Sequence, residues 1–174
     1  MKRLLPLLSL LLLLLLSACG EPKPYTETLL AMDTVMELTV YDDEAALSDL
    51  EAELRRLESL FSVTDPDSEI YAANHAGRAA LSDETAALLT SALSLCARTD
   101  GALDLTIYPV LRAWGFTTDS YAVPSPETLA ALLPAVDYRR VHLEADPSAV
   151  WLEPDTQLDL GSVAKGYAGQ RLAA

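Results

Sequence analysis

The chain has 174 residues, of which 26 are acidic and 12 are lysine or arginine, so its formal net charge at pH 7 is −14. A chain this acidic is not expected to bind nucleic acid by neutralising phosphates, and anionic lipid will repel it. An anionic ligand must therefore be held by local backbone amides or by a metal ion.

The first twenty residues, MKRLLPLLSLLLLLLLSACG, have a basic start, a leucine run and an exit of small residues, as a secretory signal does. The exit from Leu16 to Cys19 also resembles the bacterial lipobox, in which the signal is cut before the cysteine and the thiol receives a diacylglycerol. A transmembrane anchor is the alternative, but the apolar run is short for a span. We therefore expect residues 1–18 to be a lipoprotein signal peptide and 19–27 to be a polar tether. The lipid on Cys19 would anchor the protein to the extracytoplasmic face of a bacterial membrane.

The remainder of the chain, 28–174, is expected to form one domain that starts with a strand and a helix. Met36, Leu38 and Val40 alternate with polar residues, which predicts a strand. After Asp42-Asp43, apolar residues recur at helical spacing, which predicts an amphipathic helix. These residues are Leu47, Leu50, Leu54, Leu57 and Phe61.

The middle of the chain mixes turns and helices. Residues 62–77 break both periods, and their Asp-Pro-Asp-Ser sequence is typical of a turn. Ser82 is expected to cap a second helix that Gly101 ends, with Cys96 buried on its apolar side as a small hydrophobic residue. Residues 101–116 fit no regular element, and Ser125-Pro126 predicts the start of a third helix.

Residues 138–154 predict two strands joined by a turn at Asp146-Pro147. A last strand is expected near 157–160, followed by a glycine turn and the beginning of a helix. Strands and helices are thus mixed, with antiparallel pairing, and we predict an α+β fold in which a mixed sheet packs against helices.

Two segments are candidates for chemistry. In DLGSVAKG (159–166), a strand delivers Asp159 and the amides around Ser162 suit a phosphate at a helix N-terminus. The glycine spacing of a P-loop is absent, and an ordinary strand–helix junction has the same pattern. In GALDLT (101–106), Asp104 lies in an apolar run, where its carboxylate needs either a ligand amide or a backbone turn as a partner.

The other polar residues indicate no site. Asp65, Asp67 and Glu69 alternate in a loop but lack the glycine and distal glutamate of an EF-hand, so they indicate a solvated turn. His75 and His142 have no metal-ligand spacing. No serine-centred nucleophile elbow and no CxxC motif occur, so no residue is assigned as catalytic.

Five segments taken together and in order resemble the ApbE-type FAD:protein FMN transferases. They are AMDTVMELTVY, LESLFSVTDPDSEIYAAN, TDGALDLTIYPVLRAWGF, PSPETLAAL and LDLGSVAKGYAGQRL. The resemblance implies binding of FAD with Mg²⁺, cleavage of its pyrophosphate, and transfer of FMN through a phosphoester to a threonine or serine of a target protein. Such phosphoryl transfer depends mainly on positioning and charge neutralisation, so the metal rather than a basic patch is expected to hold the pyrophosphate.

The resemblance also implies roles for residues that match the family motifs. Met32 matches the methionine of an MGT-like start and is expected to line the flavin site. Ala102, Leu103 and Asp104 match an A-M-D stretch, in which Asp104 is expected to hydrogen-bond FAD. Asp159 matches the aspartate of the DLG strand, which also contacts the flavin.

Two further positions follow from the last motif. Ser162 stands where the family offers a magnesium ligand, often a backbone carbonyl, and Lys165 stands beside the bound ligand. Two residues depart from the pattern. Asp33 replaces the usual glycine, and Thr64 stands where many members have an aromatic ring that stacks on FAD. Loss of that stacking is expected to shift the balance between FMN transfer and FAD hydrolysis.

Members of the family are much longer than this chain and complete the magnesium site with residues of their second half. We therefore expect the chain to be the N-terminal half of such an enzyme, and the 174-residue form to have little or no transferase activity. The alternative is a non-enzymatic extracytoplasmic lipoprotein that binds a flavin or a protein partner. A purely structural domain is a third hypothesis.

Overall fold

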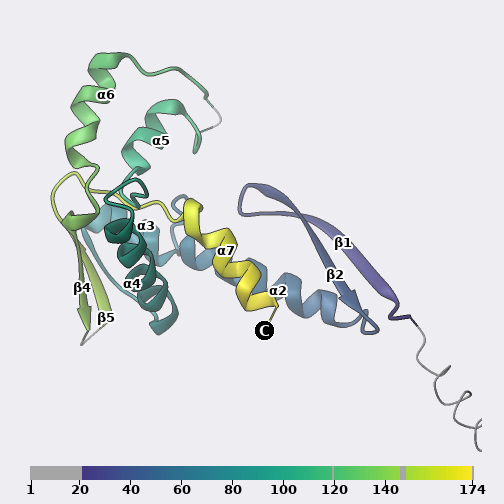
Figure 1. The fold of residues 1–174 in the computed structure, drawn as a ribbon. Helices are drawn as coiled ribbons and strands as arrows, with labels where there is room; N and C mark the ends of the chain where they lie inside the picture. The colour runs from purple at the N-terminus through teal and green to yellow at the C-terminus, as the bar shows by residue number, and fades with distance from the viewer. Residues whose placement is uncertain (1–20, 119, 146–147, 174) are drawn as a thin grey trace, which may run out of the picture.

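The computed structural model describes residues 21–118, 120–145 and 148–173. Over these residues the chain forms six α-helices and two small antiparallel sheets, which confirms the predicted α+β class (Figure 1). The predicted signal peptide with Cys19, and the predicted turn at Asp146-Pro147, lie outside the described residues. Within the described part of the chain, no helix is both long and apolar enough to cross a membrane.

A β-hairpin projects from one end of the molecule (Figure 1). Its strands are β1 (Pro24–Ala31) and β2 (Thr34–Tyr41), joined by a turn of two residues. The strand predicted from alternation is therefore confirmed in β2, but residues 24–27, expected as tether, form the start of β1. Pro24 is tolerated because it is the first residue of its strand, and every second residue of β1 faces inward, ending at the buried Ala31.

The predicted amphipathic helix is confirmed as α2 (Ala46–Phe61), which runs beneath the hairpin. Its buried face consists of Leu47, Leu54, Leu57 and Phe61, at the spacing that the sequence predicts. Both strands of the hairpin, α3 and the last helix pack on α2, so it is the element that joins the two ends of the fold.

The sequence pattern predicts no helix between 62 and 77, but α3 (Glu69–Ala76) forms there. The Ser68 hydroxyl accepts the Ile70 amide at 3.1 Å and donates to the Leu60 carbonyl at 2.8 Å, which starts the helix and ties it to α2. Eight residues are too few to show a clear helical period. A short strand, β3 (Arg78–Ala80), follows the left-handed Gly77.

The second predicted helix is confirmed as α4 (Asp83–Arg98), capped by the Ser82 hydroxyl on the Thr85 amide at 3.2 Å. Gly101 has a φ of 76° and donates to the Cys96 carbonyl, which ends this region as expected. Cys96 is fully buried, and its burial raises the pKa of the thiol.

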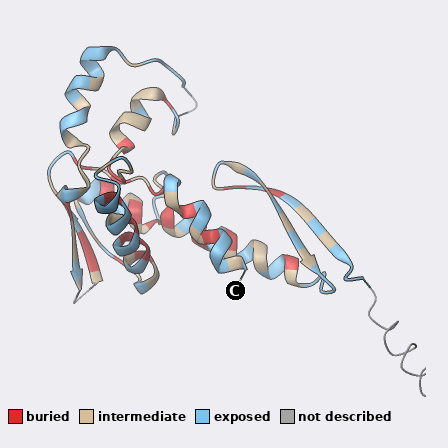
Figure 2. Ribbon diagram, viewed as in Figure 1, coloured by how far each residue is buried: buried red, intermediate tan, exposed pale blue. Residues whose placement is uncertain are grey.

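Residues 101–116, which fit no element by pattern, contain the short helix α5 (Tyr108–Trp114). The third predicted helix is confirmed as α6 (Pro126–Leu132), capped by Ser125. Figure 2 shows that burial concentrates around α2, α3 and α4, whereas α6 carries no buried residue. Two short 3-10 turns, η1 (Leu133–Ala135) and η2 (Tyr138–Arg140), follow α6.

The strands predicted in 138–154 are confirmed as β4 (Val141–Ala145) and β5 (Ser148–Leu152), which form a sheet in the order β3-β5-β4. The strand expected near 157–160 is wrong, because this connecting segment pairs with no other strand of the described chain. Instead, a side chain and a loop carbonyl take its backbone hydrogen bonds. The last helix, α7 (Gly161–Leu172), is longer than the helix start that the sequence suggests.

Glu84 of α4 holds α7 and α2 together. It pairs with Arg56 of α2 at 2.6 Å and with Arg171 of α7 at 3.4 Å, and it accepts the Tyr167 hydroxyl at 2.8 Å. This network lies over the apolar contact of α2 with α7, in which Tyr167 meets Phe61 edge-on at 5.8 Å. The second half of α7 is thereby held against α2 and α4.

Candidate functional site

A cavity of about 610 Å³ lies where the hairpin turn, the end of α2 and the start of α7 meet. We call it the site cavity. Four of the residues predicted for the flavin site line it and come from three separate parts of the sequence. They are Met32, Thr64, Asp159 and Lys165.

Asp159 lines the site cavity and lies directly before α7. Its Oδ1 accepts the Gly161 amide at 2.8 Å, so the carboxylate occupies the first amide of the helix that a phosphate was expected to meet. A Cβ at residue 161 would stand 2.9 Å from that oxygen, so a larger residue here would push the Asp159 carboxylate aside. Burial raises the pKa of Asp159 and nearby Asp33 adds to the rise, against the Gly161 amide and the Lys165 ammonium, which lower it.

The connecting segment 157–160 is positioned by a residue far away in sequence. The Asn74 side chain donates to the Leu158 carbonyl at 2.8 Å and accepts the Leu158 amide at 2.6 Å. The next amide, that of Asp159, donates to the Leu105 carbonyl at 2.8 Å. These contacts replace the ladder of a strand and fix the backbone that carries Asp159 into the cavity.

The hairpin turn, Met32 and Asp33, closes the cavity from the side of the hairpin. Two side chains of α2 hold its backbone. Glu58 Oε1 accepts the Met32 amide at 2.5 Å, and Arg55 Nη1 donates to the Leu30 carbonyl at 2.6 Å. Arg55 and Glu58 also pair with each other at 3.2 Å.

Thr64 is exposed on the loop that leaves α2. The Ser62 hydroxyl accepts the amides of Thr64 at 3.1 Å and of Asp65 at 3.0 Å, which orders this loop along the rim of the cavity. Phe116 and Thr117 line the same cavity, and the Phe116 ring is 56% exposed. An aromatic surface is therefore present at the cavity even though residue 64 is a threonine.

The other predicted residues do not line the site cavity. Asp104 accepts the Thr106 amide at 2.8 Å and its hydroxyl at 2.6 Å through Oδ1, and the Tyr138 amide at 2.9 Å through Oδ2. Its carboxylate thus holds a turn and the start of η2, which is the second of the two partners that the sequence leaves open. Ala102 is exposed and Leu103 is half-buried in the same turn.

Ser162 is exposed on the first turn of α7, beside the cavity but outside its lining. Nowhere in residues 21–118, 120–145 and 148–173 do three or more His, Cys, Asp or Glu side chains gather as metal ligands. The cavity itself is lined by four acidic residues, Asp33, Glu58, Asp65 and Asp159. A magnesium ion held by protein ligands alone therefore does not fit the described residues.

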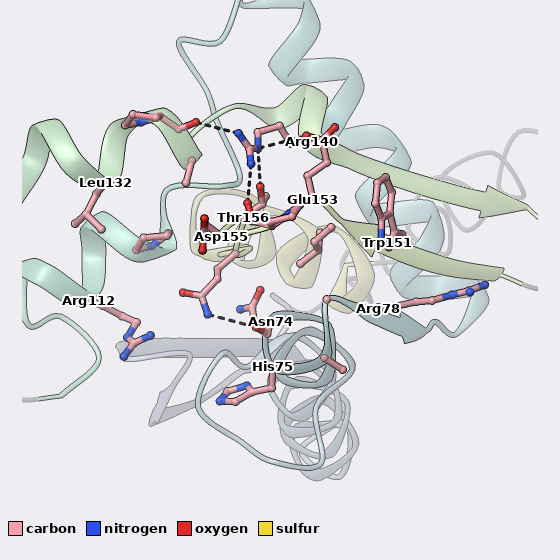
Figure 3. A pocket seen from close by; sticks show the side chains of 18 of the residues that line it. Asn74, His75, Arg78, Arg112, Leu132, Arg140, Trp151, Glu153, Asp155 and Thr156 are labelled. Atoms are coloured by element: carbon pink, nitrogen blue, oxygen red, sulfur yellow. Dashed lines mark hydrogen bonds and ion pairs between the residues drawn. The ribbon is translucent and has the colours of Figure 1, made fainter.

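A larger hollow, of about 1440 Å³, lies between α3, α5, α6 and the end of β5 (Figure 3). It contains none of the predicted residues. The guanidinium of Arg140 is already used there, because it donates to the Thr156 hydroxyl at 2.9 Å, to the Pro154 carbonyl at 2.6 Å and to the Pro134 carbonyl at 3.2 Å. The arginine thus has a structural role, and the smaller site cavity is the candidate functional site.

The fold and this cavity define an α+β protein that brings a hairpin turn and a DLG helix start together around one acidic site. The model of the ApbE family matches residues 32–174, and the chain belongs to that family. It is 30% identical over 173 residues to the FAD:protein FMN transferase of Treponema pallidum, with 89% of this chain and 48% of that protein covered. It is 32% identical over 122 residues to the enzyme of the same name from Salmonella typhimurium, with 66% and 35% covered.

Solved structures of the family agree with this assignment. The crystal structure of the ApbE protein from Thermotoga maritima matches with a TM-score of 0.81 at 26% identity, over 86% of this chain and 51% of that one. The apo flavinyl transferase ApbE from Pseudomonas stutzeri matches with a TM-score of 0.76 at 25% identity, over 89% and 55%. The chain thus spans about half the length of the relatives it matches.

The sequence analysis misses three residues that build this site: Arg55, Glu58 and Asn74. Each acts on the backbone of a segment distant in sequence, 25 to 84 residues away. The sequence signal for Arg55 and Glu58 is a charged pair on the exposed face of an amphipathic helix, which is common and unspecific. Asn74 carries no local signal at all.

Proposed function

We propose that this chain carries the FAD-binding part of an FAD:protein FMN transferase. The observation that supports this most strongly is the meeting of Met32, Thr64, Asp159 and Lys165 in one cavity, although they are spread over more than a hundred residues. The match to the ApbE family model covers residues 32–174, which include every segment that forms this cavity.

The reaction we propose is a phosphoryl transfer. The hydroxyl oxygen of a threonine or serine in a target protein attacks the FMN phosphorus of FAD, and the bond from that phosphorus to the bridging oxygen breaks. AMP leaves with the bridging oxygen, FMN stays on the target as a phosphoester, and the hydroxyl proton passes to a base. The chain's own part is to orient the substrate, and Lys165 offers a positive charge at the cavity.

We further propose that the substrate binds with Mg²⁺. The pyrophosphate of FAD is anionic, whereas the cavity is lined by four carboxylates and the two cations Arg55 and Lys165. Mg²⁺ is commonly held by one or two protein ligands together with substrate phosphates and water. The Ser162 carbonyl and Asp159 are the groups this chain would contribute, and the ion would supply charge neutralisation.

The site of action we propose is the extracytoplasmic face of a bacterial membrane, with the protein anchored by a diacylglycerol on Cys19. The support is the sequence alone: a basic start, a leucine run and the Leu-Ser-Ala-Cys exit. Anionic lipid does not attract a protein of this acidity, so the acyl chains would supply the attachment to the membrane.

Two measurements test the proposal. FAD is titrated into the purified chain with Mg²⁺ and again with EDTA, followed by flavin fluorescence; we expect saturable binding that weakens in EDTA. Transfer is then measured with the complete product of the gene that encodes this chain, as covalent flavin on a target protein. Saturable binding without any transfer would favour the non-enzymatic flavin-binding alternative, and no binding would refute the proposal.

A further inference from the structure

The hairpin turn adopts a backbone conformation that side chains disfavour. Ala31 pairs with Thr34, so Met32 and Asp33 alone make the turn, and their φ values are 50° and 55°. Two-residue turns of this kind favour glycine because positive φ brings Cβ close to the backbone. Aspartate tolerates the left-handed region, but methionine rarely occupies it.

A strained conformation persists only where its surroundings hold it, and such positions cluster at functional sites. The surroundings here are two residues of α2. Glu58 binds the Met32 amide at 2.5 Å, Arg55 binds the Leu30 carbonyl at 2.6 Å, and their own contact at 3.2 Å keeps both side chains at the hairpin. All of these except Leu30 line the site cavity.

We propose that Arg55 and Glu58 are positioning residues, which hold the strained Met32–Asp33 turn against α2 and thereby present it to the bound FAD. The proposal rests on the proposed function, because it assigns these residues to the same flavin site. A two-stranded hairpin is marginally stable by itself, and in the described chain β1 and β2 pair only with each other. The hairpin therefore depends on α2 for the position of its turn.

The same helix offers a matched control. Glu51 also pairs with Arg55, at 3.5 Å, and its side chain is about as exposed as that of Glu58, but it accepts no hydrogen bond from the hairpin residues that the structure describes. If the α2 charges acted only as a surface ion pair, replacing Glu51 and replacing Glu58 would have similar small effects. If Arg55 and Glu58 hold the turn, replacing Glu58 should disturb the turn and replacing Glu51 should not.

The test compares Glu58→Ala, Glu58→Gln and Glu51→Gln in the full 174-residue chain, with melting measured for each. Hydrogen exchange of the Met32 amide and the affinity for FAD are the readouts. We expect Glu58→Ala to speed exchange at Met32 and to weaken FAD binding roughly tenfold. Glu58→Gln, which keeps an oxygen acceptor, should recover part of both losses, and Glu51→Gln should match the wild type.

Unchanged exchange at Met32 in Glu58→Ala would overturn the proposal, as would faster exchange with wild-type FAD affinity. If the wild-type chain binds no FAD, the proposed function fails, whereas the exchange of Met32 still decides whether Glu58 holds the turn.

A second variant tests the strain directly. Asp33→Gly relaxes one of the two left-handed positions. Glu58→Ala should therefore weaken FAD binding less in the Asp33→Gly protein than in the wild type. Strict additivity of the two changes would contradict the proposal. This comparison remains informative if Glu58→Ala lowers the melting temperature, because affinity is measured on the folded fraction in each variant.

Discussion

Replacing Asn74 with alanine is expected to be among the most damaging single changes near the site. Asn74 makes two hydrogen bonds to the backbone of Leu158, at 2.8 and 2.6 Å, and Leu158 is fully buried. Alanine would leave one buried N–H and one buried C=O without partners. Each unsatisfied group costs about 1–3 kcal/mol, so we predict a loss of about 2–6 kcal/mol in the free energy of unfolding.

This loss is large against the roughly 5–15 kcal/mol that stabilises an ordinary domain. Urea denaturation followed by circular dichroism measures it. Gln157→Ala is the matched control on the same connecting segment, because Gln157 gives a single hydrogen bond of 3.3 Å to the Asn74 carbonyl and is half-buried. We expect that control to lose no more than about 1 kcal/mol.

The same variant also tests the positioning of the site. Asp159 follows Leu158 directly, so the surviving folded Asn74→Ala protein should bind FAD more weakly, whereas Gln157→Ala should bind it normally. A loss of stability no larger than that of the control would refute the reasoning about buried backbone groups. A destabilised variant with wild-type FAD affinity would show that Asn74 supports the fold without placing Asp159.

Three further predictions follow from the geometry. Burial raises the folded-state pKa of Asp159 above its unfolded value, so its contribution to stability is full below the unfolded pKa and is lost as the pH rises through the folded pKa. Asp159→Asn should therefore raise the melting temperature at neutral pH and much less in acid; equal gains at both would contradict this. Asp104→Ala should cost about 2–4 kcal/mol because the Thr106 and Tyr138 amides lose their acceptor, and a loss below about 1 kcal/mol in urea denaturation would count against that role. Cys19→Ser should release the protein from the membrane fraction or leave the signal uncut; a variant that is processed and stays membrane-bound would disprove lipidation at this cysteine.

The elements that the sequence predicts well are those with a local signal. The helices α2, α4 and α6 show either a long apolar period or a serine cap, and each forms within a few residues of its expected start. The helices α3 and α5 are too short for a period to show. Residues 24–27 have the prolines of a tether, but the inward side of β1 packs toward α2, a contact that local sequence does not reveal.

The residues of the candidate site also divide into those with a local sequence signal and those without one. Met32, Asp159 and Lys165 lie in motifs that a family resemblance can locate, and the structure brings them together with Thr64. Asp104 lies in an equally clear motif, but its carboxylate is used by backbone amides of its own turn and of η2. Asn74 acts through a hydrogen bond to Leu158, which is 84 residues away in the sequence. This contact exists only once the chain has folded, so no local pattern predicts it.

The most direct test of the account is the affinity of the chain for FAD with Asp159 intact and with Asp159→Ala, measured by flavin fluorescence in Mg²⁺ on folded protein. We predict saturable binding by the wild type and roughly ten- to hundredfold weaker binding by the variant, as expected for a lost hydrogen bond to a charged group. Equal affinity of the two proteins would contradict the assignment of the cavity beside the start of α7 as the flavin site.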